Sequence, residues 1–212
     1  MLLAFDTATP QVTVALHDGT AVAAERSSAQ TMKHGEQLAP LIAAVLDDAG
    51  ATRRDLTAVG VGCGPGPFTG LRVGLVTART LAHVLDIPVH GACTLDVLAA
   101  QAVADGDVDG AFLVATDARR KEVYLAGYDA AGARVSGPEV LRPADAASDL
   151  PVVGEGAHLY ADAFPHAVGP VRPSAGWLAR VLTGRTVEVL GPDPLYLRRP
   201  DAVARTTPKV VS

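Results

Sequence analysis

Two short apolar segments, each ending in an aspartate, lie about half a chain apart in this sequence of 212 residues. The first spans 2–6 and the second 112–117. A valine opens the next apolar segment six positions after each aspartate, at Val12 and at Val123. An internal repeat of this kind is typical of a fold built from two similar units. We therefore expect two lobes that begin alike, with a chance match of so few residues as the alternative.

The first half alternates apolar segments with helical patterns. Leu38, Leu41, Ile42 and Val45 recur at helical spacing, and Gly50 follows where a helix commonly ends. Alternating or β-branched segments bounded by turn residues predict strands. The predicted strands are 2–6, 12–16, 21–26, 58–63 and 87–90, and the predicted helices are 36–49, 70–85 and 95–104. This order predicts an α/β lobe with a mixed sheet.

The second half restarts with strands, and its pattern predicts an abbreviated lobe. Beyond Gly191, four prolines precede Val210 and predict an extended tail. The lobes are expected to meet in the Asp- and Gly-rich stretch after residue 104, which divides the chain into 1–104 and 105–212. The predicted elements of the second lobe are strands over 112–117, from 123 onward, over 133–141 and over 151–154, and a helix over 176–183.

The composition excludes several classes of protein. Hydrophobic residues make up 49% of the chain and charged residues 19%, which excludes intrinsic disorder. A net charge of −5 makes the chain a poor candidate for binding nucleic acid alone. No apolar run is long enough to span a membrane, and the first residues are not a signal peptide, so we expect a cytoplasmic protein. Cys63 and Cys93 match neither a metal-binding spacing nor a disulfide framework, and we expect both thiols to be reduced.

Glycine occupies every second position from Gly60 to Gly66. The stretch lacks the spacing of a P-loop and that of a dinucleotide-binding motif. We favour a strand with one bare face, over which another element packs closely, and a nucleotide-binding loop is the alternative.

Three residues invite a catalytic interpretation. His34 would need a second metal ligand one helical turn later, and Leu38 stands there. Glu36 could act as a general base, but acids are favoured in any first helical turn. Cys63 could be a nucleophile, although a small buried residue is its commoner role. We favour the structural role for all three and predict no catalytic group and no metal site.

Small residues recur every four positions along the predicted helix over 70–85, at Gly70, Gly74, Ala78 and Ala82. Leucines and valines fill most other positions, and the few strongly polar residues share one narrow edge. A helix that is apolar almost all round is buried on more than one side. We expect the sheet to cover one side, and either the helix over 36–49 or another protein to cover the other.

Arg72 lies in the first turn of the same predicted helix. A cation there opposes the helix dipole. We therefore expect an acidic or anionic partner for its guanidinium group.

Five motifs together resemble one protein family. They are Leu3-Ala-Phe-Asp-Thr-Ala-Thr9, His34-Gly-Glu-Gln-Leu-Ala-Pro40, Gly64-Pro-Gly-Pro-Phe-Thr-Gly-Leu-Arg-Val-Gly74, Asp117-Ala-Arg-Arg-Lys-Glu-Val-Tyr124 and Tyr196-Leu-Arg198. The sequence thereby resembles the TsaB family, the non-catalytic subunits of the bacterial machinery that makes threonylcarbamoyladenosine on tRNA. The glycine–proline–phenylalanine block is specific, and the motifs lie mainly in the first half of the chain.

The resemblance implies the two-lobed actin-like ATPase (ASKHA) fold, an α/β fold in which each lobe is like ribonuclease H, with the second lobe abbreviated. In the catalytic relative, TsaD, two histidines four residues apart bind metal, whereas here His34 is followed by Leu38. The phosphate loop of true ATPases of this fold carries a glycine two residues after the aspartate. Here that residue is Ala8, which argues against nucleotide hydrolysis.

The resemblance also implies two sets of site residues. TsaB-like proteins bind TsaD through their first two helices, here 36–49 and 70–85. The expected interface comprises Leu38, Leu41, Ile42, Val45, Gly70, Arg72, Gly74, Leu75, Ala78 and Ala82. The residues expected nearest to a bound nucleotide are Asp6, Thr7, Thr9 and Asp117.

The function that the resemblance implies is that of a scaffold and activator. It would form a heterodimer with TsaD, which transfers threonylcarbamoyl to the tRNA adenosine beside the anticodon, and a TsaE-like ATPase would join the pair. The chain would meet tRNA only within the complex, would be able to form a homodimer when alone, and would need no membrane.

The resemblance implies no cofactor of the chain's own and leaves ATP or ADP at the complex interface open. The alternative function is that of an enzyme of the same fold. An ATP-dependent kinase would need Asp6 and Asp117 to face a cleft, and a peptidase would need a nucleophile–base pair or a metal.

Overall fold

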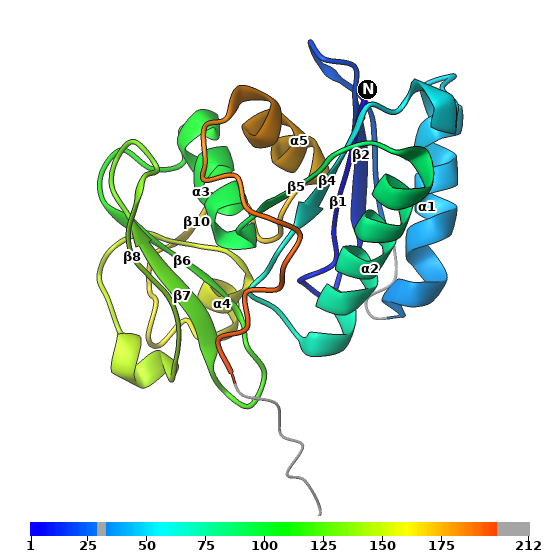
Figure 1. Ribbon diagram of the computed structural model, residues 1–212. Coiled ribbons are helices and arrows are strands. Elements are labelled where there is room, and N and C mark those ends of the chain that lie inside the picture. The colour runs from blue at the N-terminus through cyan, green and yellow to red at the C-terminus, as the bar shows by residue number, and fades with distance from the viewer. Residues whose placement is uncertain (29–32, 199–212) are drawn as a thin grey trace, which may run out of the picture.

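The computed structural model describes residues 1–28 and 33–198 and folds them into two lobes, each with a five-stranded sheet (Figure 1). The strands of the first sheet are β1 (Leu2–Asp6), β2 (Thr13–His17), β3 (Val22–Ser27), β4 (Ala58–Gly62) and β5 (Val89–Ala92). Those of the second are β6 (Phe112–Asp117), β7 (Val123–Tyr128), β8 (Arg134–Leu141), β9 (Val152–Val153) and β10 (Ala167–Val168).

The helices are α1 (His34–Asp48), α2 (Phe68–Leu85), α3 (Thr94–Asp105), α4 (Glu155–Leu159) and α5 (Ala175–Gly184), with short 3₁₀ turns η1 (Arg53–Asp55) and η2 (Pro143–Ala146). The first lobe places α1 between β3 and β4, where the second lobe has only η2 between β8 and β9. The second lobe therefore lacks a counterpart of α1.

The two sheets share one topology. The first has the order β3-β2-β1-β4-β5, and the second, read from its other edge, has the order β8-β7-β6-β9-β10. In each, the first three strands form an antiparallel meander, and the fourth and fifth add in parallel to the first. This is the ribonuclease H-like order that the resemblance implied. The predicted α/β class and the two-lobed, duplicated architecture are confirmed.

The last helix of each half packs on the sheet of the other half. Helix α5 lies on β1 and β2 of the first sheet, and α3 contacts β6, β7 and β9 of the second. Figure 1 shows both helices between the two sheets, with α1 and α2 on the outer face of the first sheet. The hydroxyl of Tyr128 donates a 2.7 Å hydrogen bond to Asp96 of α3, which ties that helix to β7. Because each of these helices packs on the sheet of the other half, the two lobes are joined through their cores.

The glycine-rich strand β4 has the bare face that its sequence predicts. A Cβ atom on Gly60 would lie 2.7 Å from Cδ1 of Leu182 in α5. A Cβ atom on Gly62 would overlap the carboxylate of Asp6. Only glycine leaves room for both neighbours, so these two residues are explained by packing.

Some predicted boundaries are wrong. The strand expected over 87–90 is Val89–Ala92, two residues later. The helix expected over 70–85 begins two residues earlier, at Phe68, with Pro67 at its N-cap. Helix α4 and strand β10 were not predicted, since both are too short to show a periodic pattern. Residues 191–198 are non-helical as expected, and the rest of the predicted extended tail lies outside the described residues.

Candidate partner-binding face and interlobe cleft

Asp6 ends β1 and is sealed inside the first lobe. Its Oδ1 accepts a 2.7 Å hydrogen bond from the backbone N–H of Ala8, and its Oδ2 accepts one of 2.7 Å from the hydroxyl of Thr94. The side chain is buried, and this burial raises the pKa of its carboxyl group. With 1% of the residue exposed, the chain as it stands presents no Asp6 oxygen to a nucleotide.

Thr7 and Thr9 have structural contacts as well. The Thr7 hydroxyl donates a 2.8 Å hydrogen bond to the carbonyl of Gly70 and accepts one of 3.1 Å from the N–H of Gly74. The Thr9 hydroxyl donates to the carbonyl of Gln11 at 3.2 Å. Both threonines are buried. Their contacts fix the loop after β1 against the start of α2.

Asp117 ends β6 at the position equivalent to Asp6, but its surroundings differ. Its Oδ1 accepts a 2.8 Å hydrogen bond from the N–H of Arg119, and its Oδ2 lies 3.2 Å from a guanidinium nitrogen of the same residue. Arg119, Arg120 and Lys121 all have positive φ angles of 57–62° and form an exposed basic turn. Within the described residues, no three His, Cys, Asp or Glu side chains are grouped to hold a metal.

A pocket of about 380 Å³ lies between the N-terminal ends of α1 and α2 and reaches Arg119 of the second lobe. Thr7, Thr9, Lys33 and His34 contribute to its walls. Nε2 of His34 donates a 2.8 Å hydrogen bond to the carbonyl of Thr9, so this nitrogen is turned into the protein and away from any metal. Of the predicted nucleotide residues, the threonines line this pocket, whereas Asp6 and Asp117 do not.

The small-residue stripe of α2 faces the chain's own loop. Gly70, Gly74, Ala78 and Ala82 are buried, and a Cβ atom on Gly74 would overlap the hydroxyl of Thr7. Buried side chains cannot contact a partner. The expectation that this stripe forms part of a partner interface is therefore wrong, and the same burial excludes three more of the expected residues: Leu38, Val45 and Leu75.

The opposite face of α2 is the exposed one. Val76 is 60% exposed and Val84 is 72% exposed. Thr80, which lies between them, and Arg72, one turn before Val76, are exposed as well. These positions are four residues apart and form one stripe along the helix. On α1, Leu41 and Ile42 of the expected interface are half-buried. Periodicity shows which residues of α2 share a face, but it did not show that the exposed face carries Val76 and Val84.

Arg72 has an aromatic environment within the described residues, and the expectation of an acidic or anionic partner stays a prediction. Its Nε donates a 2.8 Å hydrogen bond to the hydroxyl of Tyr196. Its guanidinium carbon lies 5.3 Å from the ring centre of Phe68 and 5.7 Å from that of Tyr196. Both distances are within the range of cation–π contacts. Local pattern does not predict this contact, because Arg72 and Tyr196 lie 124 residues apart in the sequence.

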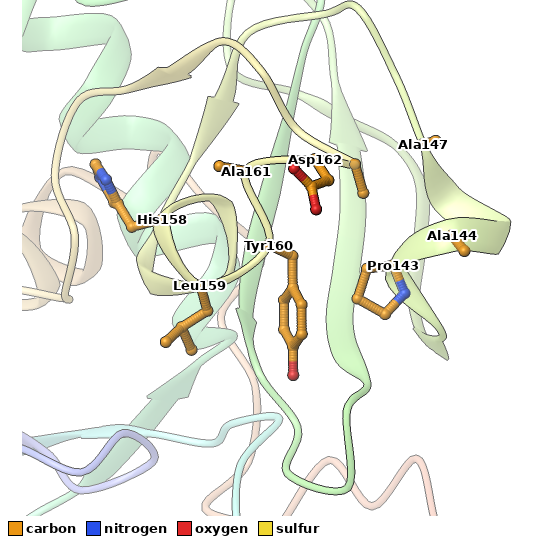
Figure 2. Close-up of a pocket in the computed structure, with 9 residues that line it drawn as sticks. Pro143, Ala144, Ala147, His158, Leu159, Tyr160, Ala161 and Asp162 are labelled. Carbon is orange, nitrogen blue, oxygen red and sulfur yellow. The ribbon is translucent and has the colours of Figure 1, made fainter.

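The remaining candidates for chemistry are inert or dispersed. Cys63 and Cys93 are fully buried, and burial raises the pKa of both thiols to about 12. A second pocket of about 640 Å³ lies in the second lobe between η2 and α4 (Figure 2). Figure 2 shows His158 and Asp162 on different sides of this pocket, pointing apart, with Tyr160 between α4 and Pro143. No acid–base pair is formed there by these residues.

Comparison with known proteins connects this arrangement to a family. A family model described as TsaD, tRNA N6-adenosine threonylcarbamoyltransferase, matches residues 22–201. The chain belongs to the TsaD family. An uncharacterized protein of Mycobacterium tuberculosis is 46% identical to it over 95% of this chain and 93% of that protein.

Two further relatives place the chain within the TsaD family. The tRNA threonylcarbamoyladenosine biosynthesis protein TsaB of Bacillus subtilis is 35% identical over 127 residues, which make up 60% of this chain and 54% of that protein. The solved structure of YeaZ from Pseudomonas aeruginosa has a TM-score of 0.73 and 31% identity, covering 92% of this chain and 99% of that one. The chain is a TsaB-like member, and the resemblance seen in its motifs is confirmed.

No helix in the described part of the chain has both the length and the apolar character needed to cross a membrane.

Proposed function

We propose that this chain is a non-catalytic subunit of a tRNA-modifying complex. It binds a TsaD-like catalytic subunit and supports the transfer of threonylcarbamoyl to the adenosine beside the anticodon of tRNA. The names of its TsaB relatives support the pathway. The observation that carries the scaffold role is the exposure of Val76 and Val84 on a helix whose other side is buried.

The state of the chain's own polar groups favours a scaffold over an enzyme. A kinase of this fold would need two carboxylates facing one cleft. The buried carboxylate of Asp6 instead accepts hydrogen bonds from the N–H of Ala8 and the hydroxyl of Thr94. The carboxylate of Asp117 forms an ion pair with Arg119. A peptidase would need a nucleophile, and burial keeps the thiol of Cys63 protonated. Both alternatives therefore lack their central group among these residues.

The exposed stripe of α2 is the surface to which we assign the partner. Large exposed apolar side chains that line up on one helix are typical of a protein interface. Helix α1 contacts α2, and its Leu41 and Ile42 are half-buried, so both helices leave some apolar surface uncovered. Arg72, which contacts the rings of Phe68 and Tyr196 at one end of the stripe, supplies a cation at the rim. Arginine and apolar side chains together are common where partners bind tightly.

A charge on the stripe tests this assignment. Val84→Glu should abolish co-purification with the TsaD-like protein of the same cell, because a carboxylate would be desolvated in an apolar interface. Val135→Glu is the matched control, since Val135 is 67% exposed on β8 of the other lobe. Circular dichroism should show both variants folded. Binding of Val84→Glu equal to that of Val135→Glu would remove α2 from the interface.

The partners beyond TsaD are also part of the proposal. We assign tRNA contact and a TsaE-like ATPase to the complex, a cytoplasmic setting to the whole, and self-association through α2 to the isolated chain. A nucleotide, if the complex binds one, would find the cations of Lys33 and Arg119 at the pocket between α1 and α2. Titration calorimetry of the isolated chain with ATP and Mg²⁺ separates the functions: tight binding would favour the kinase alternative, and no heat favours the scaffold.

A further inference from the structure

The segment 190–198 crosses from one lobe to the other over the outside of the molecule. Figure 1 shows it in orange to red, running from the α5 side down to the turn between β6 and β7. It begins on the first sheet, where Leu190 and Gly91 exchange two backbone hydrogen bonds of 2.8 Å. Further along, the N–H of Leu195 donates a 2.9 Å hydrogen bond to the carbonyl of Cys63. Its backbone is thus paired with the end of β4 and with β5.

Side chains of the segment bind it to α2. Asp193 accepts a 2.5 Å hydrogen bond from the guanidinium group of Arg79. The ring of Tyr196 lies 4.6 Å from that of Phe68, centre to centre, and its hydroxyl accepts the hydrogen bond from Arg72. Three contacts, at Phe68, Arg72 and Arg79, therefore hold the segment along α2, the helix whose outer stripe we assign to the partner.

The end of the segment binds the second lobe. Arg198 donates a 2.8 Å hydrogen bond to the carbonyl of Ala118 and forms an ion pair with Glu122, on the basic turn between β6 and β7. Leu197 packs on the core of the second lobe, and Leu195 packs on the cores of both lobes. Only Leu197 lies between Tyr196, which contacts α2, and Arg198, which contacts the second lobe, so the two attachments are rigidly coupled.

We propose that residues 190–198 form a clasp that fixes α2 relative to the second lobe, and that Tyr196 and Arg198 are positioning residues for partner binding. This inference rests on the proposed function, in which α2 binds the partner, and it names the residues that hold α2 in position. Neither residue needs to touch the partner. Opening the clasp would leave each lobe folded but would let α2 and the second lobe move apart, so a partner that needs one geometry would bind a smaller population.

The relative motion of the lobes tests the clasp without any partner. Spin labels at Arg54→Cys and Asp149→Cys lie on exposed sites of the two lobes, and both native thiols are buried. The distance distribution between the labels should be narrow in the parent and broader after Arg198→Glu. Adding Glu122→Arg reverses the ion pair and should restore the narrow distribution. Arg26→Glu, which breaks an exposed ion pair with Asp48 inside the first lobe, should leave it narrow.

Partner affinity is the second readout. We expect Tyr196→Ala and Arg198→Glu to bind the TsaD-like protein about tenfold more weakly, and the Arg198→Glu, Glu122→Arg pair to regain affinity. Tyr196→Phe keeps the ring but loses the Arg72 hydrogen bond, and serves if Tyr196→Ala unfolds. An unchanged label distribution in Arg198→Glu, or full affinity in both clasp variants, overturns the clasp. A parent chain that binds no TsaD-like protein overturns the proposed function instead, while the label distances still decide the clasp.

Discussion

The carboxylate of Asp6 at the end of β1 accepts a hydrogen bond of 2.7 Å from the hydroxyl of Thr94, at the first turn of α3. Strand β1 belongs to the first sheet, and α3 packs on the second sheet. The hydrogen bond therefore connects the first sheet to a helix that packs on the second. Burial raises the pKa of Asp6 more than the hydrogen bonds from Ala8 and Thr94 lower it.

The raised pKa predicts a pH dependence of stability. An acid whose pKa is higher in the folded chain than in the unfolded chain binds more protons when folded, so stability falls as the pH rises from the unfolded value through the folded one. We expect the free energy of unfolding of the wild type to fall, relative to that of Asp6→Asn, as the pH rises from about 4. Urea unfolding at a series of pH values measures the difference.

Asp18 provides a control of opposite sign. Hydrogen bonds from Ala21 and Thr20 lower the pKa of this exposed carboxyl group to about 2. The wild type should therefore gain stability relative to Asp18→Asn as the pH rises from that value towards the unfolded pKa of about 4. Curves for the wild type and Asp6→Asn that stay parallel at all pH values would contradict the prediction for Asp6.

The contact of Gly74 with Thr7 predicts that a bulkier residue in the stripe of α2 impairs folding before it impairs binding. Gly74→Ala should lower the free energy of unfolding by about 1–3 kcal/mol, because the added Cβ overlaps the Thr7 hydroxyl. Thr7→Ala in the same chain removes that oxygen and should recover part of the loss. Gly35→Ala is the control, since nothing lies within 4 Å of its Cβ position. Equal stability of Gly74→Ala and Gly35→Ala would show that the stripe is not sealed.

Glu25 holds the exchanged helix α5 on the first sheet. Its Oε1 accepts hydrogen bonds of 2.8 Å from the hydroxyl of Ser174 and 3.1 Å from the N–H of Gly176, at the start of that helix. Glu25→Gln should cost about 1 kcal/mol of unfolding free energy, and less at high salt, because an anion at a helix N-terminus is screened by ions. Glu36→Gln, whose exposed carboxylate pairs with Lys33, should change stability by no more than about 0.5 kcal/mol. A salt-independent loss in Glu25→Gln would speak against the electrostatic cause.

The two thiols should be unreactive in the folded protein. Burial raises the pKa of Cys63 and of Cys93 to about 12, so at pH 8 almost no thiolate is present, and neither sulfur is accessible. We expect a colorimetric disulfide reagent to titrate no thiol in native buffer and both thiols in urea. Rapid labelling of one thiol in native buffer would reveal a reactive cysteine and revive the peptidase alternative.

The duplicated fold was accessible from local pattern. The aspartate-ending strands, the valines that follow them and the glycines of β4 all depend on neighbours within a few residues, or on the simple rule that a bare face admits another element. Those features predicted two lobes, most of the strands and the bare face of β4. What local pattern missed are the elements of two to five residues, β10 and α4, which are too short to carry a period.

Which face of α2 is buried, and what holds its first turn, depended on contacts between distant parts of the chain. The small residues of α2 and its exposed valines each recur at helical spacing, and periodicity does not show which of the two sets is covered. Thr7 covers the small-residue stripe because its hydroxyl is hydrogen-bonded to the carbonyl of Gly70 and the N–H of Gly74 in the first turns of α2. Tyr196 reaches Arg72 because α3 and α5 exchange lobes and return the chain to that helix. Spacing along the chain determines which residues share a face, and only the packed chain determines which face meets water.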